Sequence, residues 1–316
     1  MAKPSVVALS GGVGGAKLAL GLARVLAPGE LMVVANTGDD FEHLGLAISP
    51  DLDTLLYTLA GLDNPETGWG RRGETWTFMA ALAALGGETW FRLGDGDLAT
   101  HVERTRRLAA GEPLSVITDD FRRRLGIAAR IVPMSDDRVR TRVSTDEGWL
   151  DFQDYFVRRQ CRPRVLELRF DGAEHARADA DFLASLADPE LRAIVICPSN
   201  PFISIEPILA LPGVRDALRA AVAPVVAVSP IIAGSAIKGP TAKMMRELGI
   251  EASAAAVARR YDGLIDAFVV DEVDAAACSV PGVTCVPARA LMRTLADREA
   301  LARVVLGAAD AVRAAR

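Results

Sequence analysis

VVALSGGVGGAKLALGLARVL, residues 6–26, gives the main indication of how this chain folds. It passes from an apolar β-branched run through a cluster of glycines into an amphipathic pattern, which is typical of a buried strand, a tight turn and a helix. Glycines there let backbone N–H groups approach an anion closely, at the positive end of a helix beginning near Ala16. The stretch predicts a phosphate cradle formed by Gly11, Gly12, Gly14 and Gly15.

The glycine pattern departs from two common nucleotide-binding fingerprints. The dinucleotide pattern G-x-G-x-x-G requires a glycine where Lys17 stands, and a P-loop requires Gly-Lys-Ser/Thr where this chain has Ala16-Lys17-Leu18. Neither a nicotinamide dehydrogenase nor an ATPase is therefore favoured. A strand-to-helix turn without a ligand is the alternative interpretation.

Composition limits the class of protein. The chain has 316 residues, half of them apolar, and a net charge of -5, which argues against nucleic acid or an anionic membrane as a partner. Cys161, Cys197, Cys278 and Cys285 show no C-x-x-C spacing and are expected to be reduced thiols. With no export or membrane signal visible, we expect a cytoplasmic protein.

Apolar β-branched runs alternate with helical patterns along most of the chain. Strands are expected at residues 6–9, 31–35, 165–170, 193–197, 225–228 and 265–270. This alternation predicts an α/β fold with a Rossmann-like, doubly wound, mainly parallel sheet. Residues 97–159 have a different pattern and are predicted to form an inserted mixed α/β lobe, which leaves 1–96 and 160–316 as the nucleotide-binding core. The segment 289–316 is expected to be a closing helix.

Acidic residues follow the second expected strand in NTGDDFEHLGLAISPDLDT, as Asp39, Asp40, Asp51 and Asp53. Carboxylates at the end of a parallel strand suit Mg²⁺ together with substrate phosphates. An ordinary helix start is the alternative, with Ser49 as the N-cap, Pro50 first and Asp51 in the first turn. Because residues two apart on a helix face different ways, Asp51 and Asp53 cannot both point into one site.

Polar loops also follow two later strands, with Ser199 and Asn200 in one and Ser229 in the other. They offer hydroxyl and amide groups to a base or ribose. Lys17, Lys238 and Lys243 make up three of the chain's four lysines and lie in candidate ligand loops, where they can reach phosphates. Solvated lysines are the alternative. His101 is interpreted as a capping or packing residue rather than a base.

An ordered set of segments resembles the 2-phospho-L-lactate transferase family of coenzyme F(420) biosynthesis. The segments are SGGVGGAK, NTGDD, ISPDLDTLLYTLAG, GWGRRGETW, LGDGDLATH, MSDD, FQDYFV, PSNPFISIEPIL and SPIIAGSAIKGP. The resemblance implies a Rossmann-like homodimer assisted by Mg²⁺. It also implies transfer of a phosphoester from a guanosine diphosphate-activated, three-carbon donor to the deazaflavin acceptor 7,8-didemethyl-8-hydroxy-5-deazariboflavin, with release of GMP.

Residue roles follow from the same resemblance. The glycine loop, Ser199, Asn200 and Ser229 are expected on the guanosine diphosphate side, where Lys17 and Lys238 can also contact phosphates. Asp39 and Asp53 are expected near the metal and the attacking hydroxyl as catalytic residues. Asp53 and Arg92 are expected at the deazaflavin. The chain departs from the family at Gly96, where a basic residue is expected, so a ligand role there is in doubt.

An aromatic-rich stretch separates ISPDLDT from WFRLGDGD and contains Trp69, Trp76 and Phe78. Such side chains suit a heteroaromatic ring, although core packing explains them equally well. The alternative function is a non-catalytic, nucleotide-sugar-binding regulator of related fold, and a dehydrogenase comes third. Phospholactyl, enolpyruvyl phosphate and phosphoglyceryl groups all remain open as the transferred unit.

Overall fold

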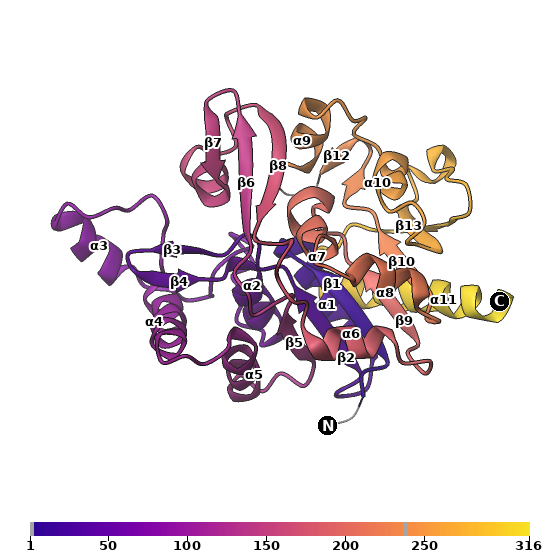
Figure 1. Ribbon diagram of the computed structural model, residues 1–316, viewed down its shortest axis with the longest axis horizontal. Coiled ribbons are helices and arrows are strands. Elements are labelled where there is room, and N and C mark those ends of the chain that lie inside the picture. Colours follow the sequence, from indigo (N-terminus) through magenta and orange to yellow (C-terminus); the bar gives the residue numbers. More distant parts are fainter. Residues whose placement is uncertain (1–2, 237–238) are drawn as a thin grey trace.

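A parallel sheet dominates the computed structural model, which describes residues 3–236 and 239–316 (Figure 1). In these residues the sheet has seven strands, ordered β14-β13-β10-β9-β1-β2-β5, and each neighbouring pair is parallel. The strands are β1 Val6–Ser10, β2 Leu31–Ala35, β5 Arg130–Pro133, β9 Ala193–Ile196, β10 Val225–Val228, β13 Ala267–Asp271 and β14 Thr284–Ala288. The predicted α/β fold with a parallel, doubly wound sheet is confirmed.

Strand β1 marks the point where the order of the sheet reverses. The chain proceeds from β1 to β2 and β5 on one side, and then returns to place β9, β10, β13 and β14 on the other. The loops after β1 and β9 therefore leave neighbouring strands in opposite directions and open a crevice between them. Open α/β sheets bind ligands at this kind of crevice.

Both faces of the sheet are buried, which explains the nearly continuous apolar strands. On one face, Val6 and Ala8 pack with helices α1 (Gly12–Val25), α2 (Pro50–Leu59) and α11 (Leu295–Ala315). On the other, Val7 and Leu9 pack with α6 (Ala180–Leu186), α8 (Val214–Ala220) and α10 (Ala254–Arg260). Helix α11 confirms the closing helix expected near the chain end.

Strand β8 (Val165–Asp171) corrects one prediction, because it does not join the parallel sheet. It pairs antiparallel with β6 (Arg140–Thr145), which also pairs with β7 (Gly148–Asp151). Its sequence VLELRFD alternates apolar and charged residues at its centre, and most of the strand is partly or fully exposed. This pattern is typical of an antiparallel strand with one solvated face.

Strand β5 lies within the segment 97–159 and forms an edge of the main sheet through its pairing with β2. Helices α4 (Asp95–Ala109) and α5 (Leu114–Arg124) precede it. The segment predicted as an insert thus supplies part of the core sheet, and β6 within it pairs with β8 outside it. The domain bounds themselves stay a prediction.

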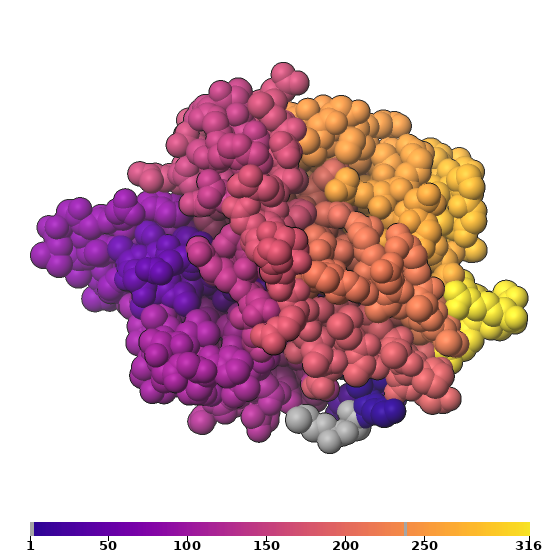
Figure 2. Space-filling model, viewed as in Figure 1, coloured from indigo at the N-terminus to yellow at the C-terminus, as the bar shows by residue number. Residues whose placement is uncertain are grey.

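The remaining elements surround the sheet. Helix α3 (Thr77–Ala84) stands out from the body at the left in Figures 1 and 2. The others are β3 (Phe41–His43), β4 (Leu46–Ile48), η1 (Asp154–Arg158), η2 (Pro201–Ile205), α7 (Glu206–Leu209), β11 (Ile231–Ile232), β12 (Ser235–Ala236), α9 (Thr241–Glu247) and η3 (Ala275–Ala277).

No helix in the described ranges has the length and apolar character needed to cross a membrane. The predicted free thiols are confirmed, since all four cysteines are unbridged.

Candidate functional site

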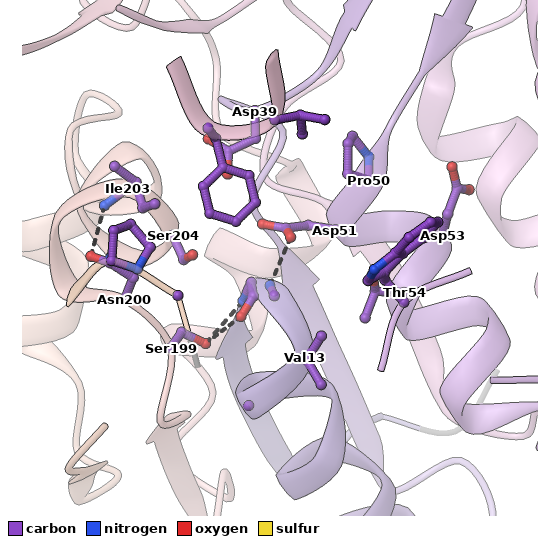
Figure 3. A pocket seen from close by; sticks show the side chains of 18 of the residues that line it. Val13, Asp39, Pro50, Asp51, Asp53, Thr54, Ser199, Asn200, Ile203 and Ser204 are labelled. Atoms are coloured by element: carbon purple, nitrogen blue, oxygen red, sulfur yellow. Dashed lines mark hydrogen bonds between the residues drawn. The ribbon is translucent and has the colours of Figure 1, made fainter. Parts of the chain in front are cut away.

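A cavity of about 500 Å³ opens at the crevice between β1 and β9. Its wall includes the glycine loop, the acidic start of α2 and the loop after β9 (Figure 3). It continues to an aromatic segment around residues 69–92 and to the start of η1. The predicted nucleotide-side and acceptor-side segments therefore share one cavity.

The glycine loop is tighter than the sequence indicates. Helix α1 begins at Gly12, which has a φ of +64°, rather than near Ala16. A Cβ atom on Gly14 would lie 2.5 Å from the carbonyl oxygen of Pro198, and one on Gly15 would lie 2.4 Å from Ser199 Oγ. These glycines therefore let the loop after β9 pack directly against the first turn of α1.

Ser199 and Asn200 line the cavity and also shape the loop after β9. Ser199 Oγ accepts from Gly11 N at 3.1 Å and donates to Gly11 O at 2.8 Å (Figure 3). Asn200 Oδ1 accepts from Phe202 N at 2.9 Å and so begins η2. Ser229 lines the cavity as well, and its hydroxyl donates to Ile231 O at 2.9 Å.

Asp39 and Asp51 form a pair of buried carboxylates beside the glycine loop. Asp51 accepts from Gly12 N at 2.7 Å and from Asn36 Nδ2 at 2.9 Å, and burial still raises its pKa to about 6. Burial and the charge of Asp51 raise the pKa of Asp39 well above its ordinary value. Asp39 Oδ1 has no hydrogen-bond partner among the described residues. Such an oxygen donor set fits Mg²⁺.

Asp53 points away from Asp51 along helix α2 (Figure 3), but both carboxylates line the same cavity. The prediction that they cannot both face one site is therefore wrong. Both oxygens of Asp53 are paired with the guanidinium of buried Arg104, which leaves Asp53 less suited to a cation than the sequence indicates. Asp39 and Asp51 could therefore hold a metal ion between them.

The start of α2 is as predicted at Pro50, but Ser49 does not cap it through its side chain. Ser49 Oγ instead donates to Asp40 Oδ2 at 2.7 Å. Burial raises the pKa of Asp40 to about 7, against the opposing charge of Arg140.

Aromatic side chains also line the cavity, although not all of those expected. Trp69 faces it together with Trp90, Phe91 and Arg92. Trp76 and Phe78 pack instead into a small cluster with Ile48, Met79 and Leu93. The Arg92 guanidinium lies 4.1 Å from the centre of the Trp76 ring, so Trp76 orients Arg92 from outside the cavity.

A second aromatic wall was missed by the sequence reasoning. Phe152 and Phe156 line the cavity, and their rings stack with centroids 5.3 Å apart and an interplanar angle of 14°. Phe152 lies just before the π-helix η1, and Phe156 lies within it. The segment FQDYFV was noted only as part of the family resemblance, so the sequence assigned no role to these rings.

Helix α4 supplies a group of residues that the sequence reasoning did not assign to the site, although it interpreted His101 as a capping or packing residue. Asp97 and His101 line the cavity, and Arg104 follows on the same helix face. His101 Nε2 lies 3.2 Å from Asp97 Oδ2, and Asp97 Oδ1 accepts from the hydroxyl of Tyr57 at 2.6 Å. The spacing of Asp97, His101 and Arg104 by four and three residues was the available signal.

The predicted lysines have different outcomes. Lys17 lines the cavity, and its ammonium donates to Met292 O at 3.2 Å. Lys243 does not line it, because its ammonium pairs with Glu247 at 2.6 Å and donates to Pro163 O. Lys238 lies outside the described residues.

Gly96 faces a carboxylate rather than the cavity. Its N–H donates to Glu74 Oε2 at 2.7 Å, and a Cβ atom there would lie 3.1 Å from Glu74 Oε1. A ligand role for position 96 therefore gains no support from the cavity lining.

Comparison with known proteins gives the family. Residues 6–281 match the family described as 2-phospho-L-lactate transferase CofD. A Streptomyces griseus protein named phosphoenolpyruvate transferase is 41% identical over 318 residues, which cover 98% of this chain and 99% of that protein. A Mycobacterium tuberculosis protein of the same name is 39% identical over 330 residues, which cover 96% of this chain and 98% of that protein.

A solved structure supports the fold alone. A member of the UPF0052 family from Bacillus halodurans matches with a TM-score of 0.63 at 13% identity, covering 97% of this chain and 99% of that one. The residues that match the family and the full-length relatives include the glycine loop and the loops after β9 and β10. The chain belongs to the 2-phospho-L-lactate transferase CofD family.

Proposed function

We propose that the protein is a Mg²⁺-dependent transferase of coenzyme F(420) biosynthesis. It moves a phosphorylated three-carbon acid from a guanosine diphosphate-activated donor to 7,8-didemethyl-8-hydroxy-5-deazariboflavin and releases GMP. The observation that carries this proposal is one cavity that is lined by a glycine loop, paired carboxylates and aromatic walls. Family membership supports a transferase. The same resemblance leads us to propose a cytoplasmic homodimer.

The donor occupies the glycine-loop end in this proposal. Backbone N–H groups at the start of α1 and the ammonium of Lys17 provide donors for a diphosphate. Ser199, Asn200 and Ser229 contribute polar groups from the loops after β9 and β10 for the nucleoside. A guanine nucleotide is thus held across the point where the order of the strands reverses.

Asp39 and Asp51 hold the cation in this proposal. Two buried carboxylates with raised pKa values repel each other, and a divalent cation would relieve that repulsion. Mg²⁺ bound there would neutralise charge on the transferred phosphate and on the leaving GMP. Asn36 and Gly12 orient Asp51 through their hydrogen bonds, so the carboxylate is positioned before any ligand enters.

The acceptor ring occupies the aromatic end. Phe152 and Phe156 offer a stacked pair of rings, and Trp90 and Phe91 belong to the other aromatic segment. A planar heteroaromatic ring suits such surroundings, and Arg92 adds a charged donor at the edge. Water is excluded from the reacting groups when both ends are filled.

The transferred unit in this proposal is enolpyruvyl phosphate. Full-length relatives at 39% and 41% identity carry the name phosphoenolpyruvate transferase, which favours this group over phospholactyl and phosphoglyceryl.

Product analysis tests the proposal. The protein is incubated with the deazaflavin, Mg²⁺ and each of the three guanylylated donors, and products are identified by mass spectrometry. We expect the enolpyruvyl adduct to form fastest, with one GMP released per adduct. Guanine nucleotide binding without an adduct from any donor would favour the regulatory alternative. Faster formation of another adduct would contradict the assigned three-carbon unit.

A further inference from the structure

A cluster of ionisable side chains in the cavity wall is separate from the Asp39–Asp51 pair. Asp97 from α4 has a side chain 14% exposed, and its two oxygens face the hydroxyl of Tyr57 and the ring of His101. His101 is buried, with 2% exposure, and contacts both Asp97 and Asp53. Oxygen or nitrogen atoms of Asp53, Asp97 and His101 all lie within 4.8 Å of one another.

Arg104 fixes the proton on His101. Arg104 Nη1 lies 3.4 Å from His101 Nδ1, and because a guanidinium only donates, Nδ1 is the acceptor. The ring proton of a neutral His101 is then on Nε2, which faces Asp97 Oδ2 at 3.2 Å. Asp97 is thus an ionised acceptor that receives a hydrogen bond from Tyr57 and lies beside His101 Nε2, which has no hydrogen-bond partner among the described residues. Although burial raises its pKa, these neighbours lower the pKa below its ordinary value.

Asp97 is the carboxylate of the described cavity wall that is assigned neither to the cation nor to a guanidinium. Asp51 accepts from Gly12 and Asn36, and both oxygens of Asp53 are paired with Arg104. Each oxygen of Asp97 faces one protein donor, while a carboxylate offers about four lone-pair sites. Asp97 therefore retains acceptor capacity for a hydroxyl of a bound polyol.

We infer that Asp97 accepts the proton of the attacking acceptor hydroxyl and that His101 is a positioning residue that holds Asp97 in place. This inference rests on the proposed function. The hydroxyl oxygen forms a bond to the donor phosphorus that carries the three-carbon acid, and the bond from that phosphorus to the bridging oxygen breaks. The bridging oxygen leaves with its electron pair as part of GMP. The hydroxyl proton passes to an Asp97 oxygen and then to solvent.

Replacement of Asp97 by its amide tests the proton-acceptor role. We expect Asp97→Asn to lower kcat by about 100-fold or more, the usual contribution of a general base. Deazaflavin and donor affinities should stay within about twofold, because Asn keeps the size of the side chain and an acceptor oxygen. Glu103→Gln is the matched control, since Glu103 lies on the same helix but pairs with Arg106 in solvent.

Variants of the neighbours test the positioning role. His101→Gln keeps an N–H donor near Asp97 and should retain more kcat than His101→Ala, with both binding the acceptor normally. Tyr57→Phe should lower kcat without changing acceptor affinity, because only the hydroxyl at 2.6 Å is lost. Combined with Asp97→Asn, neither His101→Gln nor Tyr57→Phe should lower kcat much further.

Three results would overturn the inference but not the proposed function. All three require that the wild type forms the adduct. The first result is an unchanged kcat in the Asp97→Asn variant, and the second is an Asp97→Asn variant in which only acceptor binding is weakened. The third is a tightly bound metal that the wild type holds and Asp97→Asn loses, which would make Asp53, Asp97 and His101 a metal site. A wild type that binds both substrates and forms no adduct would overturn the proposed function and this inference together.

Discussion

Asp51 and Asp53 show how two neighbouring carboxylates acquire different roles from their surroundings. Asp51 meets neutral donors, Gly12 N and Asn36 Nδ2, so it keeps a charge that a cation can neutralise. Asp53 meets the guanidinium of Arg104, which already neutralises it. Helical spacing predicts that the two diverge but does not say which one faces the glycine loop.

Asp51→Asn tests the assignment of the metal. We expect kcat to fall by about 100-fold or more and the Mg²⁺ requirement to weaken, because a lost metal-binding charge removes several kcal/mol of transition-state stabilisation. Calorimetric titration of Mg²⁺ in the presence of GDP measures the binding directly. Asp216→Asn, at an exposed surface pair with Arg219, is the control. Normal Mg²⁺ affinity in the Asp51 variant would place the metal elsewhere.

Asp40 makes stability depend on pH. Its pKa is raised to about 7 in the folded protein, so the folded state holds the proton more tightly than the unfolded chain does. The resulting stabilisation is complete below about pH 4 and is lost as the pH rises through about 7. We expect Asp40→Asn to flatten the fall in unfolding free energy across this window. Urea denaturation in EDTA measures it, and an unchanged slope would contradict the prediction.

Arg92 separates acceptor binding from donor binding. We expect Arg92→Ala to weaken deazaflavin affinity by about 1.5–3 kcal/mol, typical of a lost charge-assisted hydrogen bond, with GDP affinity nearly unchanged. Fluorescence titration of the deazaflavin and calorimetry of GDP measure the two affinities. Equal loss of both would indicate that the variant disturbs the whole cavity, and equal acceptor affinity would remove Arg92 from the site.

At the scale of elements, the glycine loop joins two neighbouring strands through close packing. The turn of α1 and the loop after β9 approach so closely that Gly14 and Gly15 have no room for a Cβ atom. The sequence predicts an anion cradle there from the conformational freedom of glycine. It does not reveal the packing role, because the loop that occupies the space lies more than 180 residues further along the chain.

Gly14→Ala tests this packing. A Cβ atom 2.5 Å from the backbone oxygen of Pro198 should lower the free energy of unfolding by about 1–3 kcal/mol and weaken GDP binding. Gly307→Ala in α11 is the matched control, because nothing lies within 4 Å of its Cβ position. That variant should be more stable by roughly 0.5–1 kcal/mol, since alanine is the better helix former. Equal effects of the two substitutions would contradict the packing explanation.

Strands that are buried on both faces were predictable from sequence, and the sheet partner of a strand with one exposed face was not. Strands β1, β2 and β10 are buried on both faces, so their β-branched runs identify them. The alternation of apolar and charged residues in β8 indicates an antiparallel strand with one solvated face. It does not indicate that the partner strand is β6, because that pairing forms only in the folded protein. Arg104 was missed because its spacing from Asp97 and His101 places the three on one helix face but does not show that this face is buried opposite Asp53.

At the scale of the whole molecule, one cavity extends from the glycine loop to the aromatic walls. If the nucleotide and the deazaflavin occupy different ends, each should bind without displacing the other. We expect saturating GDP to leave deazaflavin affinity unchanged or higher, measured by fluorescence titration with and without GDP. Competition between the two ligands would place both at the same end and contradict the proposed arrangement.

The path of the chain between β2 and β5 has a consequence for how such an enzyme can change. This single crossover, residues 36–129, starts and ends in adjacent strands of the main sheet and carries Asp39, Asp51 and the aromatic segment. The nucleotide cradle comes from elsewhere, at the start of α1 and after β9. Under the proposed function, exchanging this crossover between relatives would change the cation ligands and one aromatic wall, and would leave the nucleotide cradle and the Phe152–Phe156 pair in place.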